Sequence, residues 1–140
     1  MNAFIKQFKW VMIVAGVLTC TMFYAAIDPV SSQQSNFGEA LEGPLAQVLV
    51  RSWGILVGVV GLMLLFAAFN EANRRMVLLV AAGSKLAFVG LVLTFGRQFL
   101  RFQIGTAVIV DSVMVVLFAT YLAATWKRDL GGRHPRQRVR

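Results

Sequence analysis

Four long apolar segments set what this chain can fold into. They run from Trp10 to Ile27, from Leu45 to Phe69, from Met76 to Gly96 and from Phe102 to Trp126. Each holds at most one charged residue, and each meets or approaches the roughly 20 residues with which a helix crosses about 30 Å of hydrocarbon. Because backbone groups in hydrocarbon must hydrogen-bond within their own segment, all four segments are predicted to be helices.

The composition agrees with a fold that spans a membrane. The chain of 140 residues is 58% hydrophobic and only 14% charged, whereas an average soluble domain is about a quarter charged. A chain this short cannot bury so many apolar side chains from water. We therefore predict an all-α integral membrane four-helix bundle that forms one domain over residues 1–126. The basic tail, 127–140, is predicted to be disordered.

Basic residues in the short connections indicate the orientation of the bundle. The side of the membrane that carries both termini would hold Lys6, Lys9, Arg74, Arg75 and the six basic residues of the tail. Both termini are thus predicted to be cytoplasmic, in a multi-pass protein of the bacterial inner membrane. The first segment is longer than the roughly 7–15 residues of a signal-peptide core, so it is expected to be retained. The tail is attributed to topology and anionic lipid rather than to nucleic acid.

Several chemistries are excluded by what the chain lacks. Cys20 is the single cysteine and His134, in the tail, is the single histidine. These residues provide neither an intrachain disulfide nor a bis-histidine haem site. Asp111 is the one carboxylate within the apolar segments, which cannot build a carboxylate-rich metal centre. No metal and no cofactor are predicted, and the lack of a catalytic constellation favours a protein that is not an enzyme.

Small residues form two stripes at helical spacing. Gly54, Gly58 and Gly61 share one face of the second segment, and the first two form a GxxxG pattern that permits close helix packing. A second stripe, in the third segment, consists of Gly83, Ala87, Gly90 and Thr94. Both stripes are predicted to pack against neighbouring helices, in preference to a role in dimerisation.

The charged residues within the segments indicate where a site would lie. From the rise per residue, Arg51 lies about 9 Å and Asp111 about 8 Å below the outer boundary. An ionised side chain at such depth normally faces a partner or a water-filled cavity. The sequence therefore predicts an Arg51–Asp111 ion pair, which would serve either as a structural clamp or as part of a substrate or proton site.

Lys85 lies near the middle of the membrane, about 200° around its helix from Gly83. Its long side chain could rise about 6 Å toward Asp111, so that one carboxylate would serve two cations. Three interpretations stay open: a lysine neutralised within this network, a lysine that contacts a ligand or carries a proton, and a lysine that faces lipid.

Other polar residues gather at the outer level. Thr21, Tyr24 and Asp28 share one helix face, and Arg97 lies near the outer end of the third segment. We predict an outward-facing polar cleft, roofed by an irregular loop from Pro29 to Pro44. Its candidate ligand-binding residues are Arg51, Lys85, Arg97, Asp111 and Tyr24.

The stretches LVRSWGILVGVVGLMLLFAA, FGR and AVIVDSVMVVLF resemble the bacterial four-transmembrane DoxX-like proteins of unknown function. The resemblance covers about Leu45 to Leu122 and rests on Arg51, Gly54, Gly58, Arg97 and Asp111. It implies a small inner-membrane protein that is sometimes a partner of redox or quinone-linked complexes. Lys85 is not part of the pattern.

Two function hypotheses follow. In the first, the protein is a binding or accessory subunit that holds a small amphipathic or anionic molecule in the polar cleft. In the second, it is a homo-oligomeric, proton-coupled transporter of small solutes that uses Lys85 and Asp111. The expected partners are the lipid bilayer, such a ligand, and further copies of the chain or a larger membrane complex.

Overall fold

Residues 2–131 of the computed structural model are described, and they contain helices but no strand. The helices are α1 (Asn2–Cys20), α2 (Phe23–Ile27), α3 (Pro29–Phe37), α4 (Pro44–Phe69), α5 (Glu71–Phe95), the 3₁₀ helix η1 (Arg97–Arg101) and α6 (Gln103–Gly131). Within these residues, four stretches are long and apolar enough to cross a membrane: Lys6–Ile27, Pro44–Phe69, Glu71–Phe95 and Gln103–Lys127. The predicted all-helical fold with four such helices is confirmed.

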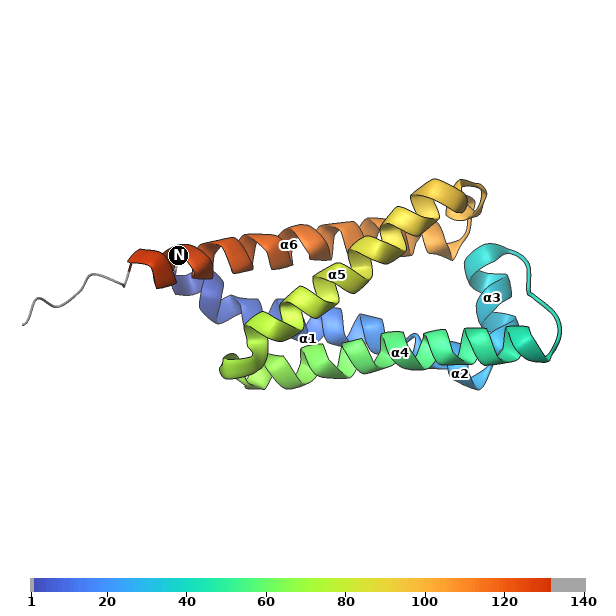
Figure 1. Ribbon diagram of the computed structural model, residues 1–140, viewed down its shortest axis with the longest axis horizontal. Helices are drawn as coiled ribbons and strands as arrows, with labels where there is room; N and C mark the ends of the chain where they lie inside the picture. Colours follow the sequence, from blue (N-terminus) through green and yellow to red (C-terminus); the bar gives the residue numbers. More distant parts are fainter. Residues whose placement is uncertain (1, 132–140) are drawn as a thin grey trace, which may run out of the picture.

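The long helices run up and down along one axis (Figure 1). The two ends of the described chain lie at the same end of the bundle as the α4–α5 turn, and we call this the termini end. The other end, which we call the far end, carries α2, α3 and η1. Between 22% and 33% of an 18-residue apolar window in each candidate span is buried inside the protein, so most of the residues in these windows lie on the outer surface of the bundle.

The first apolar segment is bent rather than straight. Thr21 and Met22 form a turn between α1 and α2, and their amides donate to the carbonyls three residues earlier, over 3.3 and 3.2 Å. The hydroxyls of Thr19 and Thr21 also donate to carbonyls of the preceding turn. Threonine hydroxyls that bond back in this way commonly bend a helix. The bend sets α2 against α4.

The glycines of α4 make this approach possible, as predicted for Gly54, Gly58 and Gly61. A Cβ at Gly54 would lie 2.8 Å from the Met22 carbonyl oxygen, and one at Gly61 would lie 2.7 Å from the Cys20 nitrogen. A Cβ at Gly58 would lie 2.6 Å from the Phe23 ring. Close backbone contact through small residues is the usual way for membrane helices to associate, because lipid gives them no hydrophobic drive.

The second small-residue stripe does not pack as predicted. Gly83 and Gly90 are exposed, and a Cβ at either glycine would meet no atom within 4 Å. The reason is the rotation of α5: its opposite face, with Leu78, Ala81 and Lys85, is the one that turns toward the bundle. The stripe is therefore on the outer surface of this protomer.

The segment after α2 is also more ordered than the predicted loop. Asp28 caps α3 by accepting from the Ser31 amide over 3.1 Å, Pro29 occupies the first turn, and Gly38 ends the helix at φ 78°. An Asp-Pro start and a left-handed glycine end are standard helix boundaries. Only residues 38–43 form an irregular connection. α3 stands across the far end (Figure 1). There, Phe37 meets Phe99 of η1 edge to face.

The ends of three long helices differ from prediction, and one of them is α1, which begins at Asn2, eight residues before the predicted start at Trp10. α5 begins at Glu71, five residues before the predicted start, and α6 continues to Gly131. Both additions are polar turns that extend the helices past the apolar segments. The rest of the predicted disordered tail, 132–140, lies outside the described residues.

Candidate functional site

Lys85 of α5 and Asp111 of α6 form an ion pair in the middle of the bundle. The lysine ammonium donates to Asp111 Oδ1, and the two side chains are 7% and 18% exposed. Lys85 is central on the inward face of α5, so its charge points at the neighbouring helix and not at lipid. Of the three interpretations of Lys85, the structure excludes the lipid-facing one for this protomer.

The ion pair lies between two apolar clusters. Toward the termini end, Ala81 and Met114 belong to the larger core, which also contains Phe8, Met12, Leu64, Leu78 and Phe118. Toward the far end, Val92 and Val108 belong to a smaller cluster with Ile104. Charged groups in such surroundings gain little from solvent, so each depends on the other for its stability.

The predicted Arg51–Asp111 ion pair is wrong. Arg51 is exposed, and its guanidinium donates instead to the carbonyls of Ala26 and Ile27 and to the side chain of Gln47. These carbonyls are the unsatisfied C-terminal groups of α2, where a cation is favoured. The depth estimate placed Arg51 and Asp111 at one level. It could not show that α2 would offer nearer acceptors.

Arg97 and Tyr24 also lie apart from the ion pair. Arg97 is exposed at the start of η1 and donates to the Leu93 carbonyl over 2.6 Å. Tyr24 is half exposed on α2. The structure thus brings together two of the five predicted ligand-binding residues, and it does not gather the other three into one polar cleft with them.

The carboxyl of Asp28, at the far end, is stabilised in its charged form. Hydrogen bonds from the side chain and then the backbone of Ser31 hold the pKa of its carboxyl below the ordinary value, and the positive charge of Arg51 acts in the same direction. Asp28 and Arg51 thus support the α2–α3 corner from either side. Arg51, which the sequence suggested for a ligand, thus has a structural role here.

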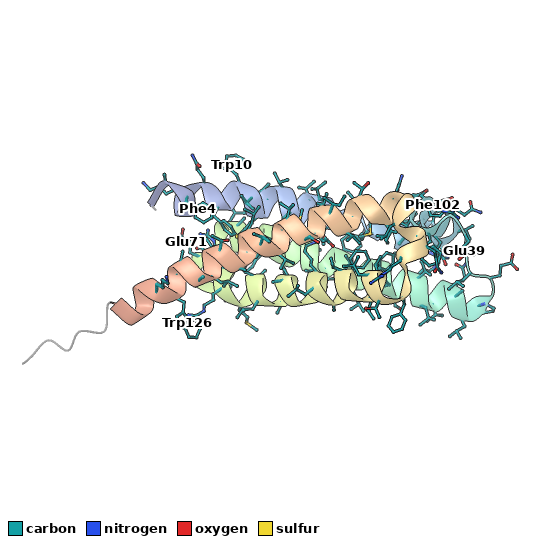
Figure 2. All side chains as sticks on the ribbon, turned by 90° about the horizontal axis from the view of Figure 1, so that it is seen from above. Phe4, Trp10, Glu39, Glu71, Phe102 and Trp126 are labelled. Carbon is teal, nitrogen blue, oxygen red and sulfur yellow. The ribbon has the colours of Figure 1, made fainter. Side chains whose placement is uncertain are left out.

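An open apolar groove lies between α1 and α6. Its volume is about 500 Å³. Its walls are Trp10, Val11, Val14, Ala15 and Leu18 on α1, and Ile109, Val110, Val113, Met114 and Leu117 on α6. Beyond its termini-end limit α1 and α6 are in contact, because the Phe8 ring stacks on that of Tyr121 at 4.1 Å, and in Figure 2 Trp10 stands on the outer side of α1. The sequence did not indicate the groove, because its residues are ordinary apolar ones and only the splay of the helices creates it.

A smaller hollow of about 180 Å³ lies at the far end, lined by Phe37, Gly38, Glu39, Gln98, Phe99, Arg101 and Phe102. Figure 2 shows Glu39 and Phe102 at this end. The Arg101 guanidinium lies 5.0 Å from the Phe102 ring centroid and the Phe37 and Phe99 rings pack on each other. The Arg101 guanidinium and the aromatic rings of this hollow are therefore engaged with one another.

Arg74 is a buried charge whose packing the sequence did not reveal. It is 4% exposed and donates to the Ala67 and Ala68 carbonyls over 3.3 and 3.1 Å, and to the Tyr121 hydroxyl over 3.4 Å. These bonds satisfy the C-terminal carbonyls of α4 and join the α4–α5 turn to α6. The short α4–α5 connection was the only signal that could have indicated this cap.

Metal ligands do not gather in the described part of the chain, where no group of three His, Cys, Asp or Glu residues could hold an ion. No family model matches the sequence, and no similar curated protein or solved structure is found. The resemblance to the DoxX-like proteins accordingly stays a prediction.

Proposed function

We propose that this chain is a small multi-pass membrane protein that acts as a binding or accessory subunit and holds a small amphipathic molecule. The observation that carries the proposal is the α1–α6 groove, which is concave, apolar and open on one side. Binding sites for small molecules are usually concave and mostly apolar. The ligand would thus lie in the groove and not in the predicted polar cleft, with its apolar part along the α1 wall from Trp10 to Leu18.

We place the protein in the bacterial inner membrane with both termini in the cytoplasm. Charge supports this orientation: among the described side chains, the termini end holds Lys6, Lys9, Arg74, Arg75 and Lys127 against Glu71 alone. The far end holds three basic and three acidic residues, Arg51, Arg97, Arg101, Asp28, Glu39 and Glu42. An excess of basic residues marks the cytoplasmic side of a bacterial membrane protein.

Two valines of α6 provide the test of the groove. Val113 lines the groove, whereas Val116, three residues further along, does not, and both side chains are more than half exposed. Val113→Trp should fill the groove and displace a bound molecule, while Val116→Trp should leave it in place. Native mass spectrometry of each variant, released from mild detergent, measures the retained mass. Equal retention in both variants would contradict the proposal.

The Lys85–Asp111 ion pair supports a second candidate, a homo-oligomeric transporter that couples protons to a small solute. A buried ionisable pair within a membrane span is a recognised feature of proton pathways. Purified protein in liposomes should then show solute flux that depends on a pH gradient and disappears in Lys85→Met. The double variant Lys85→Met/Asp111→Leu controls for folding, because it leaves neither charge unpaired. Undiminished flux in either variant would remove the pair from the mechanism.

A further inference from the structure

The small hollow at the far end lies at the boundary of the apolar layer, because all seven of its lining residues fall outside the four candidate spans. Its η1 side lies between the span that ends at Phe95 and the span that begins at Gln103. Its α3 side lies between the span that ends at Ile27 and the span that begins at Pro44. The head groups of a bilayer occupy roughly 5–7 Å beyond the hydrocarbon on each side. The hollow is therefore at the level of head groups and not of acyl chains.

Two opposite charges border this hollow without pairing with each other. Arg101 and Glu39 both line it and are both exposed, but no ion pair joins them. Among the described residues, the Arg101 side chain interacts only with the Phe102 ring, which offers no oxygen to its N–H groups. The side chains of Glu39 and Gln98 have no hydrogen-bond partner in the described part of the chain. Charged donors and acceptors thus remain available from two separate segments.

The aromatic walls of the hollow are held in place by their neighbours. The Phe37 and Phe99 rings pack edge to face with their centroids 5.4 Å apart. The Phe102 ring lies against Gly38, where any Cβ would overlap it, and Gly38 has the positive φ of 78° that ends α3. Side chains that are already fixed lose little freedom when a ligand binds. The faces of such rings also attract ammonium groups, so the walls are prepared for a cation.

The size of the hollow restricts its ligand to a small polar group. Its volume of about 180 Å³ corresponds to about six water molecules of about 30 Å³ each. Pockets for drug-sized ligands measure about 300–1,000 Å³. Three of its seven lining side chains are polar, whereas the α1–α6 groove has none. The hollow therefore suits a head group or a free molecule of similar size.

The charges of the hollow select a molecule that carries both signs. A simple anion would be attracted by Arg101 and repelled by Glu39, and the reverse holds for a simple cation. The far end adds no net attraction of either sign, because its described side chains include three basic and three acidic ones. A guanidinium binds phosphate particularly well, and a carboxylate with aromatic rings suits an ammonium. A phosphate joined to an ammonium satisfies both sides.

We propose that the far-end hollow binds a zwitterionic group of the phosphoethanolamine class. The phosphate accepts from Arg101 and Gln98, and the ammonium lies beside Glu39 and the ring faces. This inference goes beyond the proposed function, since the hollow and the α1–α6 groove share no residue. A phospholipid of the surrounding bilayer and a soluble ester in the water outside it present the same chemistry, and the second experiment distinguishes these two sources.

The first experiment compares phosphatidylethanolamine with phosphatidylglycerol, which has the phosphate but no ammonium. Delipidated protein in mild detergent is titrated with each lipid, with identical acyl chains, and native mass spectrometry gives the two dissociation constants. We expect phosphatidylethanolamine to bind about tenfold more tightly, a factor that matches one hydrogen bond to a charged group. Arg101→Gln and Glu39→Gln should each weaken its binding about tenfold for the same reason.

Arg97→Gln and Glu42→Gln are the matched controls. Each removes the same charge from an exposed far-end residue that does not line the hollow, and neither should change the dissociation constant. Arg101→Gln and Glu39→Gln shift the net charge in opposite directions, so a loss in both cannot come from a general attraction between lipid and charge. Unaltered or tighter binding in Glu39→Gln would overturn the inference, as would an equal loss in the controls.

The second experiment determines the source of the head group. Glycerophosphoethanolamine, which has no acyl chains, is titrated into isotope-labelled protein in phosphatidylglycerol nanodiscs, and the amide chemical shifts of Gly38 and Phe99 are followed. Saturable shifts that Glu39→Gln abolishes would support the inference with a soluble ester as the source. Shifts that appear only when phosphatidylethanolamine replaces half of the nanodisc lipid would support it with the bilayer as the source. Shifts with neither, or equal shifts with glycerophosphate, would overturn it.

Val113→Trp separates this site from the groove. The variant fills the groove between α1 and α6 and leaves the hollow unchanged, so its dissociation constant for phosphatidylethanolamine should equal that of the wild type. Binding that Val113→Trp weakens and Arg101→Gln does not would assign the lipid to the groove, which would support the proposed function and overturn the inference.

Discussion

The Lys85–Asp111 ion pair gives a quantitative prediction for the stability of the bundle. Asp111→Leu leaves Lys85, whose side chain is 7% exposed, without a carboxylate partner between two apolar clusters. Breaking a buried pair by removing one partner costs about 3–5 kcal/mol, and a lone lysine at the centre of a membrane helix costs about 2.5–3.5 kcal/mol. Because these ranges meet near 3 kcal/mol, we expect Asp111→Leu to lower the free energy of unfolding by about 3 kcal/mol.

The double variant Lys85→Met/Asp111→Leu tests the cause of that loss. An apolar pair of similar volume is often as stable as the buried ion pair that it replaces, so the double variant should unfold within about 1 kcal/mol of the wild type. Steric trapping in bicelles measures these free energies without harsh detergent. Leu86→Met, at an exposed neighbour of Lys85, serves as the control and should change stability by less than about 0.5 kcal/mol.

Two results would refute this reasoning. If Asp111→Leu were as stable as the wild type, the carboxylate would not be neutralising Lys85. If the double variant were as unstable as the sum of its two single variants, the loss would come from changed side-chain volume and not from an unpaired charge.

Three further predictions concern packing, capping and pH. Gly54→Ala should destabilise the fold by about 1–3 kcal/mol, because its Cβ would press on the α2 backbone. Gly83→Ala, whose Cβ would meet no neighbouring atom, should be neutral or stabilising by up to about 1 kcal/mol. Equal changes in the free energy of unfolding of the two variants, measured under the same conditions, would contradict this prediction. Arg74→Met should lower the free energy of unfolding by about 2–3 kcal/mol, since hydrogen bonds that involve a charged group stabilise more than neutral ones. A melting temperature like that of the wild type would show that the C-terminal end of α4 needs no cap. The Asp28 carboxyl has a lowered pKa, so the stability that it contributes is present above its unfolded pKa of about 3.9 and is lost as the pH falls through the lower folded value. The protection factor of the Ser31 amide, which is its exchange rate relative to the intrinsic rate at the same pH, should therefore fall over that acidic range, and Asp28→Asn should remove this pH dependence of the protection.

The number and approximate bounds of the long helices could be predicted because they depend on local properties. Each apolar segment must be a helix in hydrocarbon, and its length is set by the bilayer. The packing role of the glycines in α4 could also be predicted, since their spacing places them on one helix face without side chains. The α3 helix was equally marked, by Asp28, Pro29 and Gly38, but the polar serines and glutamines between these signals led to the prediction of a loop.

The candidate site was less predictable because it depends on how the helices rotate and splay. Lys85 and Asp111 could be matched by depth and reach, and their meeting was anticipated. Arg51 had the same depth but a different set of neighbours, since the bend at Thr21 and Met22 brings the carbonyls at the end of α2 to it. The rotation that turns Lys85 inward also turns Gly83 outward, and no local pattern fixes that rotation.

The ion pair has a consequence for the alignment of α5 and α6. Apolar side chains on two membrane helices can replace one another with little loss when the helices slide, because lipid and neighbouring leucines solvate them equally well. A slide of one turn, about 5.4 Å, would carry the Lys85 ammonium away from Asp111 and into one of the flanking apolar clusters. One polar position at a helix interface is known to fix the register of otherwise interchangeable contacts. A single pair of charges thus selects one alignment among several that the apolar residues would accept.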